Sequence, residues 1–256
     1  MVTWTDLWLY ALLALMCWTV AALLSLRGGW HRLVCLLTAV GLLVFGSYIG
    51  LMWYSLGHPP LRTMGETRLW YSFFLPLVGL VTYVRWRYRW ILSFSTMLSA
   101  VFICVNLFKP EIHSRELMPA LQSPWFAPHV IVYMFAYATT GAATLMAVWQ
   151  LLRGHDQLPA IDNLTRVGVS FLTIGMLFGA LWAKEAWGTY WSWDPKETWA
   201  AATWLCYLIY LHLRRSRPEA VRPALLWLLL CFVCLQMCWW GINYLPSAQG
   251  ISAHTY

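Results

Sequence analysis

The chain has 256 residues, of which 61% are hydrophobic and only 11% are charged. This composition excludes an ordinary soluble domain of that length and indicates a polytopic membrane protein. The formal net charge of +7 does not indicate nucleic-acid binding, because the basic residues occur in short groups between apolar runs, which is the pattern of membrane topology.

Eight apolar runs are candidates to cross the roughly 30 Å of a bilayer's hydrocarbon core. They cover residues 6–26, 33–54, 68–84, 90–108, 129–152, 164–183, 199–213 and 223–240. The first run is expected to be retained as a span, because no early positive cluster or small-residue cleavage site accompanies it. The seventh run is short and would be lengthened by its aromatic start or tilted in a locally thin bilayer. The sequence therefore predicts an all-α transmembrane bundle of about eight spans, forming a single domain over residues 1–256.

The charges of the connections predict the orientation of the bundle. Arginines are concentrated in the connections after the first, third, fifth and seventh runs, for example in residues 85–89 and 214–217. The other connections mix basic with acidic residues. By the positive-inside rule, both termini lie outside, on the same face as the longer and chemically richer loops.

The cysteines do not predict a disulfide framework. All seven lie inside apolar runs, where they behave as small hydrophobic side chains. Cys231 and Cys234 have Cys-x-x-Cys spacing, but they lie in the middle of a span and no histidine follows Cys234. We therefore interpret them as packing residues, and neither a thioredoxin-like motif nor a haem attachment site is predicted.

The most distinctive stretch lies between the sixth and seventh runs. It contains five aromatic residues, Trp187, Tyr190, Trp191, Trp193 and Trp199. Indoles in such a cluster can form a wall against which a planar aromatic ligand stacks. The alternative is an interfacial aromatic belt, which needs only one or two such residues at each helix end and has no use for a glycine among them. Gly188 therefore favours the ligand-binding interpretation.

The second half of this stretch carries the signals of a helix start. Asp194 suits an N-cap, Pro195 suits the first helical position, and Glu197 completes a capping-box-like pattern. The stretch is thus predicted to be an aromatic loop that ends by starting a helix. Asp194 is either this cap or a residue at the ligand.

Four histidines are candidates for metal ligation. His129 opens an apolar span, and His254 lies in a tail, residues 241–256, that has no charged side chains. Two imidazoles beside an aromatic wall would suit a bis-histidine haem site, and the alternative is that each is an interfacial polar residue. His58, in a Gly-His-Pro-Pro turn, is either a loop residue or a further ligand. His212, at the cytoplasmic end of the seventh run, is either functional or snorkelling.

Together these residues resemble a known family. Residues 187–199, WGTYWSWDPKETW, resemble the WWD motif of haem-handling membrane proteins. The ending DPKETW, followed by Tyr-Leu-His at 210–212, resembles specifically the CcsA (ResC) family of System II cytochrome c biogenesis. The resemblance runs from about residue 50 to the end of the chain.

Other parts of the chain extend this resemblance. Residues 57–60 with Glu66 are similar to the family's loop before its Tyr-Glu-Ser helix, although residues 64–67 read Met-Gly-Glu-Thr. Pro128-His129 matches the first external histidine of the family, and residues 243–256 resemble the tail that holds the second. In that tail Thr255 stands where the family usually has serine.

The resemblance implies a function in haem handling. Haem b, as substrate and bound ligand, would be exported across or collected within the membrane and presented on the outer WWD surface between His129 and His254. Its vinyl groups would then be joined to the thiols of a Cys-x-x-Cys-His segment of an apocytochrome c. His212 matches a histidine associated with haem inside the membrane, where the other ligand would belong to a CcsB/ResB-type partner.

The resemblance also implies roles for the residues of the motif. The residues expected to bind haem are Trp187, Gly188, Tyr190, Trp191, Trp193 and Asp194. Three of the indoles would grip the porphyrin, and the Asp194 carboxylate would fix the geometry of the motif. The chain would be one subunit of a cytochrome c synthase (haem lyase) that positions its reactants, and no acid or base for thioether formation can be identified.

The resemblance also implies the partners and the location of the chain. Partners besides the CcsB/ResB-type protein would be the apocytochrome, membrane lipid and thiol-reducing proteins, with no nucleic acid. The membrane would be a bacterial inner membrane with the WWD loop outside, or a thylakoid membrane.

Two alternative functions are left open. One alternative is a CcmC-like protein that delivers haem without ligation, against which residues 195–198 argue. Another is a transporter of a different amphipathic solute, which would show no porphyrin absorbance.

Overall fold

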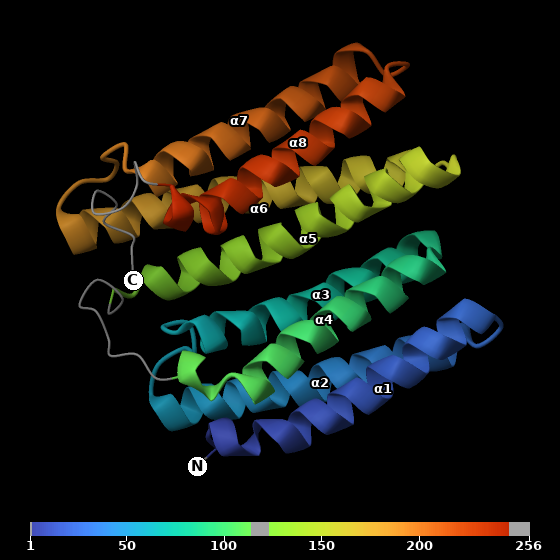
Figure 1. Cartoon of the computed structure of the whole chain (residues 1–256), viewed down its shortest axis with the longest axis vertical. Coiled ribbons are helices and arrows are strands. Elements are labelled where there is room, and N and C mark those ends of the chain that lie inside the picture. Colours follow the sequence, from blue (N-terminus) through green and yellow to red (C-terminus); the bar gives the residue numbers. More distant parts are fainter. Residues whose placement is uncertain (1, 114–122, 246–256) are drawn as a thin grey trace. The chain divides into compact units, whose positions relative to one another are not determined.

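The computed structural model describes residues 2–113 and 123–245, and no β-strand occurs among them. They form eight α-helices (Figure 1). Three short 3₁₀ segments are also present: η1 (Trp4–Asp6), η2 (Pro110–Ile112) and η4 (Gly241–Tyr244). The chain divides into two compact units, Met1–Leu117 and Met118–Tyr256, and each is described by itself.

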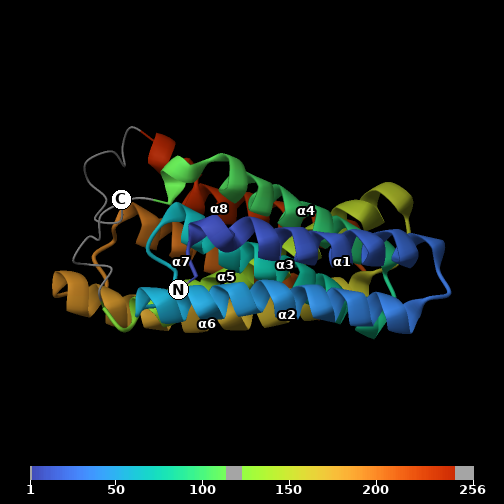
Figure 2. The ribbon, with the colours of Figure 1, turned by 90° about the horizontal axis from the view of Figure 1, so that it is seen from below.

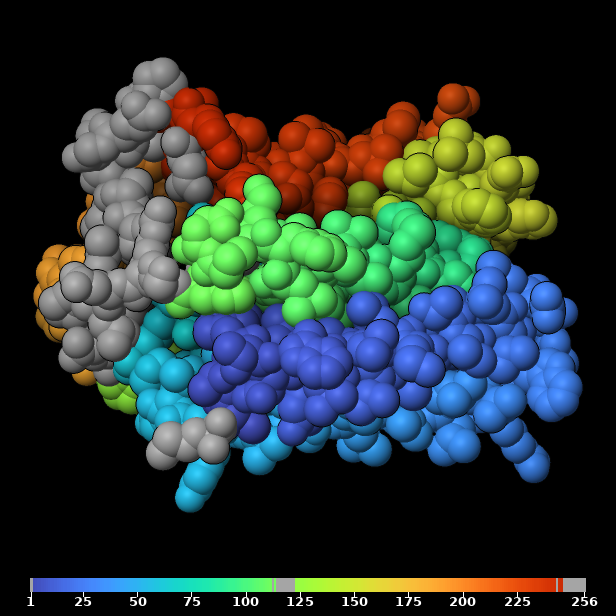
Figure 3. Space-filling view, turned by 60° about the horizontal axis from the view of Figure 1, so that its bottom comes forward, coloured from blue at the N-terminus to red at the C-terminus, as the bar shows by residue number. Residues whose placement is uncertain are grey.

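Unit 1 is a ring of four helices. They are α1 (Leu7–Arg27), α2 (His31–Leu56), α3 (Met64–Trp86) and α4 (Arg89–Phe108). Each packs on the next helix along the chain, as Figure 2 shows for α1 and α2. The ring is closed because α1 also packs on α4, and these two helices lie side by side in the space-filling view of Figure 3.

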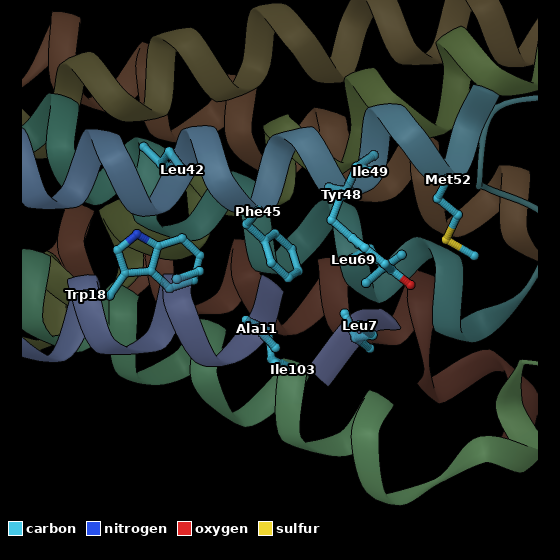
Figure 4. Close-up of a cluster of buried hydrophobic side chains, with 11 residues drawn as sticks. Leu7, Ala11, Trp18, Leu42, Phe45, Tyr48, Ile49, Met52, Leu69 and Ile103 are labelled. Atoms are coloured by element: carbon cyan, nitrogen blue, oxygen red, sulfur yellow. The ribbon is translucent and has the colours of Figure 1, made fainter. Parts of the chain in front are cut away.

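The interior of unit 1 is filled by apolar side chains. Figure 4 shows Trp18 of α1 and Phe45 of α2 within this cluster, beside Leu69 of α3 and Ile103 of α4. The indole of Trp18 is 1% exposed, and its Nε1–H donates to the backbone oxygen of Thr38 at 3.3 Å. Large buried side chains with satisfied polar atoms are what stabilise such a bundle.

Unit 2 repeats the same arrangement. Its helices are α5 (Phe126–Arg153), α6 (Leu158–Trp187), α7 (Pro195–Ser216) and α8 (Val221–Trp239). Again each packs on the next one, and α5 packs on α8. Because successive helices run in opposite directions, the start of α5, the end of α6, the start of α7 and the end of α8 meet at one end of the unit (Figure 1).

The opposite end of unit 2 is held by a buried ion pair. Asp162 of α6 accepts hydrogen bonds from Nε of Arg214 of α7, at 3.1 and 3.2 Å to its two oxygens. The hydroxyl of Tyr210 donates to the same carboxylate at 2.7 Å. The side chains of the ion pair are only 9% and 12% exposed, so removal of either partner would leave a buried charge.

The helices confirm the all-α polytopic prediction, because each predicted apolar run lies within or overlaps one helix. In the part of the chain that the structure describes, six helices are long and apolar enough to cross a membrane, namely Trp4–Arg27, α2, α4, α5, α6 and α8. In α7 the apolar centre is short, as predicted, since charged residues occupy both of its ends. The chain is an integral membrane protein. Its single domain over 1–256 and its outward-facing termini stay predictions.

Candidate functional site

A cavity lies at the end of unit 2 where the four helix ends meet. Its volume is about 140 Å³, and all four helices and the α6–α7 loop contribute to its wall. Six of the residues that line it are His129, Tyr133, Trp182, Trp191, Lys196 and Trp239. The sequence prediction that His129 lies on the same side as the aromatic loop is therefore confirmed.

His129 is held in a defined tautomer. Its Nδ1 lies 2.8 Å from the backbone oxygen of Gly175, and because a carbonyl oxygen can only accept, Nδ1 carries the hydrogen. In the neutral ring the lone pair is then on Nε2. A backbone oxygen that orients the other ring nitrogen is the usual support of a metal-binding histidine. The metal-binding role of His129 stays a prediction, and in this tautomer Nε2 would be the coordinating atom.

A glycine makes room for this ring. A Cβ at Gly179 would lie 2.7 Å from Cε1 and 2.9 Å from Nδ1 of His129, closer than real contacts allow. The imidazole therefore occupies space that any other residue at position 179 would fill. This close approach of α5 and α6 brings His129 within reach of the Gly175 oxygen.

Aromatic rings surround the imidazole. The ring centroid of Trp182 lies 5.5 Å from that of His129, and Tyr133 meets His129 edge-on at 4.7 Å. Trp182 also contacts Trp187, with a centroid distance of 4.9 Å. On the α8 side, Trp239 lies 5.3 Å from Tyr137. These distances are typical of favourable aromatic pairs, and the rings form a continuous apolar wall.

The aromatic loop begins where α6 ends. Gly188 has φ +84°, a left-handed conformation, and its N–H donates to the backbone oxygen of Lys184 at 3.1 Å. Lys184 in turn donates from Nζ to the oxygen of Gly188 at 2.8 Å, and its ammonium lies 5.4 Å from the ring centroid of Tyr190. The glycine thus ends the helix, which explains its place among the aromatic residues.

Glu197 organises the second half of the loop. Its Oε2 accepts hydrogen bonds from the backbone N–H of Ser192 at 2.7 Å and of Asp194 at 3.2 Å. Asp194 accepts from the N–H of Lys196 at 2.8 Å. The predicted capping box is therefore present, and Asp194 acts as the N-cap of α7 and does not line the cavity.

Trp193 has an unusual backbone conformation. Its φ is +59°, in the left-handed region that costs a residue with a side chain about 1–2 kcal/mol. Its backbone oxygen accepts a hydrogen bond from Oγ1 of Thr198 at 3.2 Å. This conformation turns the indole outward, where it is 71% exposed.

The predicted indoles therefore lie in three different environments. Trp191 lines the cavity, and its buried Nε1 has no hydrogen-bond partner in the part of the chain that the structure describes. Trp187 is half-buried against Trp182. Trp193 is outside the cavity and meets Trp191 edge-on at 5.7 Å. Tyr190 lines the cavity although it is 57% exposed.

Of the four predicted histidines, His129 is the one among the described residues that line the cavity. His254 lies outside the described residues. His58 belongs to unit 1, where its Nδ1 is 3.0 Å from the backbone oxygen of Pro59. His212 is exposed near the end of α7, at the far end from the cavity. The roles predicted for these three residues stay predictions.

Among the described residues that line the cavity, Lys196 is the cation. Lys196 precedes the apolar part of α7, and burial lowers the pKa of its ammonium group, an effect that the nearby Asp194 partly opposes. Cys238 of α8 also lines the cavity and donates from Sγ to the backbone oxygen of Lys196 at 3.6 Å. The wall is thus apolar over most of its area, with a few polar groups.

Several wall residues were not identified from the sequence. Tyr133 and Tyr137 follow His129 at intervals of four residues, a spacing that places all three on one face of α5 and could have identified them. Trp182 and Trp239 carry no such signal, because both lie in apolar runs that are rich in tryptophan.

The donor set restricts what the cavity can hold. No group of three His, Cys, Asp or Glu side chains that could hold a metal ion occurs among the described residues. A planar metal complex suits His129 and the aromatic wall.

Comparisons with known proteins identify the family of the chain. A model of the cytochrome c assembly protein family matches residues 7–248. The chain is 32% identical to "Cytochrome c biogenesis protein CcsA" of Synechococcus sp. (strain CC9605), covering 88% of this chain and 86% of that protein. It is 30% identical to the CcsA protein of Marchantia polymorpha, covering 82% of each.

A third relative is longer than this chain. The CcsA protein of Chlamydomonas reinhardtii is 34% identical over 80% of this chain, and the match spans 62% of the length of that protein. The match of the family model covers all eight helices and the cavity described above. The chain therefore belongs to the cytochrome c assembly protein family, is related to the CcsA proteins, and has a role in cytochrome c biogenesis.

Proposed function

We propose that unit 2 binds haem as its cargo at this cavity and presents it for covalent attachment to an apocytochrome c. The observation that supports this most strongly is His129, whose Nδ1 is fixed by Gly175 at 2.8 Å in the tautomer that would coordinate iron through Nε2. The aromatic wall beside it suits a porphyrin face.

The size of the cavity suits a cargo that is handed on. Its volume of about 140 Å³ is smaller than the roughly 300–1,000 Å³ of pockets that enclose a whole ligand. Haem would therefore be held by part of its macrocycle, and the exposed Tyr190 and Trp193 would cover more of it. A partly open ligand can meet the thiols of a second protein.

The chain's contribution to the reaction would be positioning. His129 would hold the iron, the wall rings would exclude water, and the loop that Glu197 organises would set the orientation of Trp191. By family resemblance, His254 would be the second axial ligand and His212 a ligand for haem inside the membrane, completed by a CcsB/ResB-type partner. We assign no acid or base to thioether formation.

The visible spectrum of the full chain, purified in detergent, tests this proposal. The wild type is expected to show the absorbance of imidazole-ligated haem and to support holocytochrome c formation in cells that also contain the partner. His129→Ala is expected to lose most of both. His155→Ala is the matched control, because His155 is exposed in the α5–α6 loop and its loss should change neither.

Two results would overturn the proposal. If His129→Ala retained normal haem content and normal holocytochrome yield, His129 would not be a ligand. If the wild type never bound porphyrin, the cavity would belong to a different amphipathic molecule.

A further inference from the structure

We infer that one end of unit 1 binds the phosphate headgroup of an anionic membrane lipid. The site is a cluster of exposed arginines, which we call the arginine end. It goes beyond the proposed function, because it involves neither unit 2 nor haem. Its members are Arg27, Arg32, Arg85, Arg87 and Arg89.

Two helix connections bring these arginines together. The α1–α2 connection and the α3–α4 connection lie at the same end of unit 1 (Figure 1). They meet there, because a Cβ at Gly28 would lie 2.6 Å from Nη1 and 3.1 Å from Nη2 of Arg89. Gly28 has φ +80°, a conformation that suits glycine, and its missing side chain makes room for this guanidinium group. The charge of Arg87 also reaches His31 of α2. The two connections therefore form one basic surface.

No carboxylate of unit 1 balances this charge. Residues 7–65 and 67–110 contain neither Asp nor Glu. The acidic residues of unit 1 that the structure describes lie at its other end, at the starts of α1 and α3 and after α4, namely Asp6, Glu66 and Glu111. The helix dipoles do not offset the charge either, because Arg32 and Arg89 lie in the first turns of α2 and α4, where the positive end of the dipole repels cations. An anion from outside unit 1 would therefore be attracted to the arginine end.

The surroundings of the arginines indicate that this anion is a lipid headgroup. At the arginine end α1 ends and α2 and α4 begin, and all three helices are long and apolar enough to cross a membrane. Trp30 is 60% exposed there, and the guanidinium group of Arg85 lies 5.2 Å from the ring centroid of Trp86. Tryptophans at the ends of spans typically lie at the level of the headgroups. A planar guanidinium group can donate two parallel hydrogen bonds to a phosphate, and clusters of basic residues beside spans are typical of sites for anionic lipids.

The corresponding end of unit 2 has acidic residues among its basic ones. Arg214 is paired with Asp162 there, and Asp156 and Glu219 lie in the two connections. The positive charge that orients spans in a membrane is thus partly balanced in unit 2 and unbalanced in unit 1. Orientation alone does not explain this difference, whereas an anionic ligand on unit 1 does.

Native mass spectrometry of the full chain in detergent tests the inference with two probes, phosphatidylglycerol and phosphatidylcholine. Both lipids have a phosphate, but only phosphatidylglycerol has a net negative charge. The wild type should bind phosphatidylglycerol about 10- to 100-fold more tightly, because each arginine near a membrane surface contributes about a factor of five. The double variant Arg87→Gln/Arg89→Gln should lower this affinity about 10- to 25-fold and leave the affinity for phosphatidylcholine unchanged. The double variant Arg87→Lys/Arg89→Lys, which keeps the charge, should retain most of the preference.

Lys109→Gln is the matched control. It removes one positive charge from the opposite end of unit 1, two residues from Glu111, and should change the affinity for phosphatidylglycerol less than twofold. Arg89→Gln alone should lower that affinity about fivefold. In the wild type the preference should also weaken as salt is added, because the charges are exposed, and this measurement needs no variant.

Three results would overturn the inference. The first is equal affinity of the wild type for the two lipids. The second is a preference for phosphatidylglycerol that Arg87→Gln/Arg89→Gln retains in full. The third is displacement of phosphatidylglycerol by inorganic phosphate at the same concentration, because the arginine end would then be a site for a soluble phosphate.

Discussion

Each unit is a ring of four helices, but the two units use tryptophan in opposite ways. In unit 1 the indole of Trp18 is 1% exposed, and its N–H donates to the Thr38 oxygen. In unit 2 the indole of Trp191 lines a cavity, and its N–H has no partner in the described structure. The first is a core residue whose N–H is satisfied, and the second borders a cavity with its N–H unsatisfied. A buried indole therefore indicates a binding site only where its N–H has no acceptor and its ring borders a cavity.

The third helix of each unit sharpens this comparison. Both α3 and α7 begin with a capping box whose glutamate is at the third helical position, Glu66 in α3 and Glu197 in α7. Oε2 of Glu66 accepts from the N–H groups of Arg62 and Thr63. The same local device thus occurs in both units, and in unit 2 it holds an aromatic loop over a cavity.

The largest expected effects follow from replacing the indoles of Trp18 and Trp191 by alanine. Trp18→Ala should lower the free energy of unfolding by about 3–5 kcal/mol, because it leaves a void in a filled core. Trp191→Ala should cost only about 1 kcal/mol and should remove most haem binding. Thermal unfolding in detergent and the Soret absorbance measure the two effects. If Trp191→Ala were as destabilising as Trp18→Ala and bound haem normally, Trp191 would be a core residue.

A second prediction concerns the glycine beside His129. The methyl group of Gly179→Ala would collide with the imidazole and break its hydrogen bond to Gly175. Loss of one such bond, worth about 1 kcal/mol, should weaken haem binding by about fivefold to tenfold. Titration of the full chain with ferric haem, followed by the Soret absorbance, measures this change in affinity.

Gly50→Ala is the control for that substitution. A Cβ at Gly50 of α2 would meet nothing within 4 Å, so haem binding should not change, and stability should rise slightly because alanine is the better helix former. Unchanged haem affinity in Gly179→Ala would show that the His129 ring has more freedom than this packing implies.

The sequence predicted the helices because apolar runs of sufficient length have few alternatives in a membrane. It also predicted the start of α7, since Asp194, Pro195 and Glu197 carry local signals that need no tertiary context. Local signals also explain a difference: α6 continues to Trp187, past the predicted residue 183, because nothing before Gly188 ends it.

The wall of the cavity could not be predicted in the same way. In a chain that is apolar on most helix faces, periodicity does not show which face of α6 or α8 points inward, so Trp182, Cys238 and Trp239 carried no signal. The outward turn of Trp193 depends on a left-handed backbone that non-glycine residues rarely adopt. Such features arise from packing between helices, which a single sequence does not specify.

The smallest expected effects are those of removing the glutamate from each of the two capping boxes. Glu66→Ala and Glu197→Ala each remove an acceptor of two backbone N–H groups, so each should cost about 1 kcal/mol of stability. Only Glu197→Ala should also change the Soret band of bound haem, because Glu197 holds the loop that positions Trp191. Parallel unfolding curves and spectra measure both effects. If the two variants lost equal stability and Glu197→Ala kept the wild-type spectrum, the box would serve only to start α7, and the position of Trp191 would depend on its contact with Trp193.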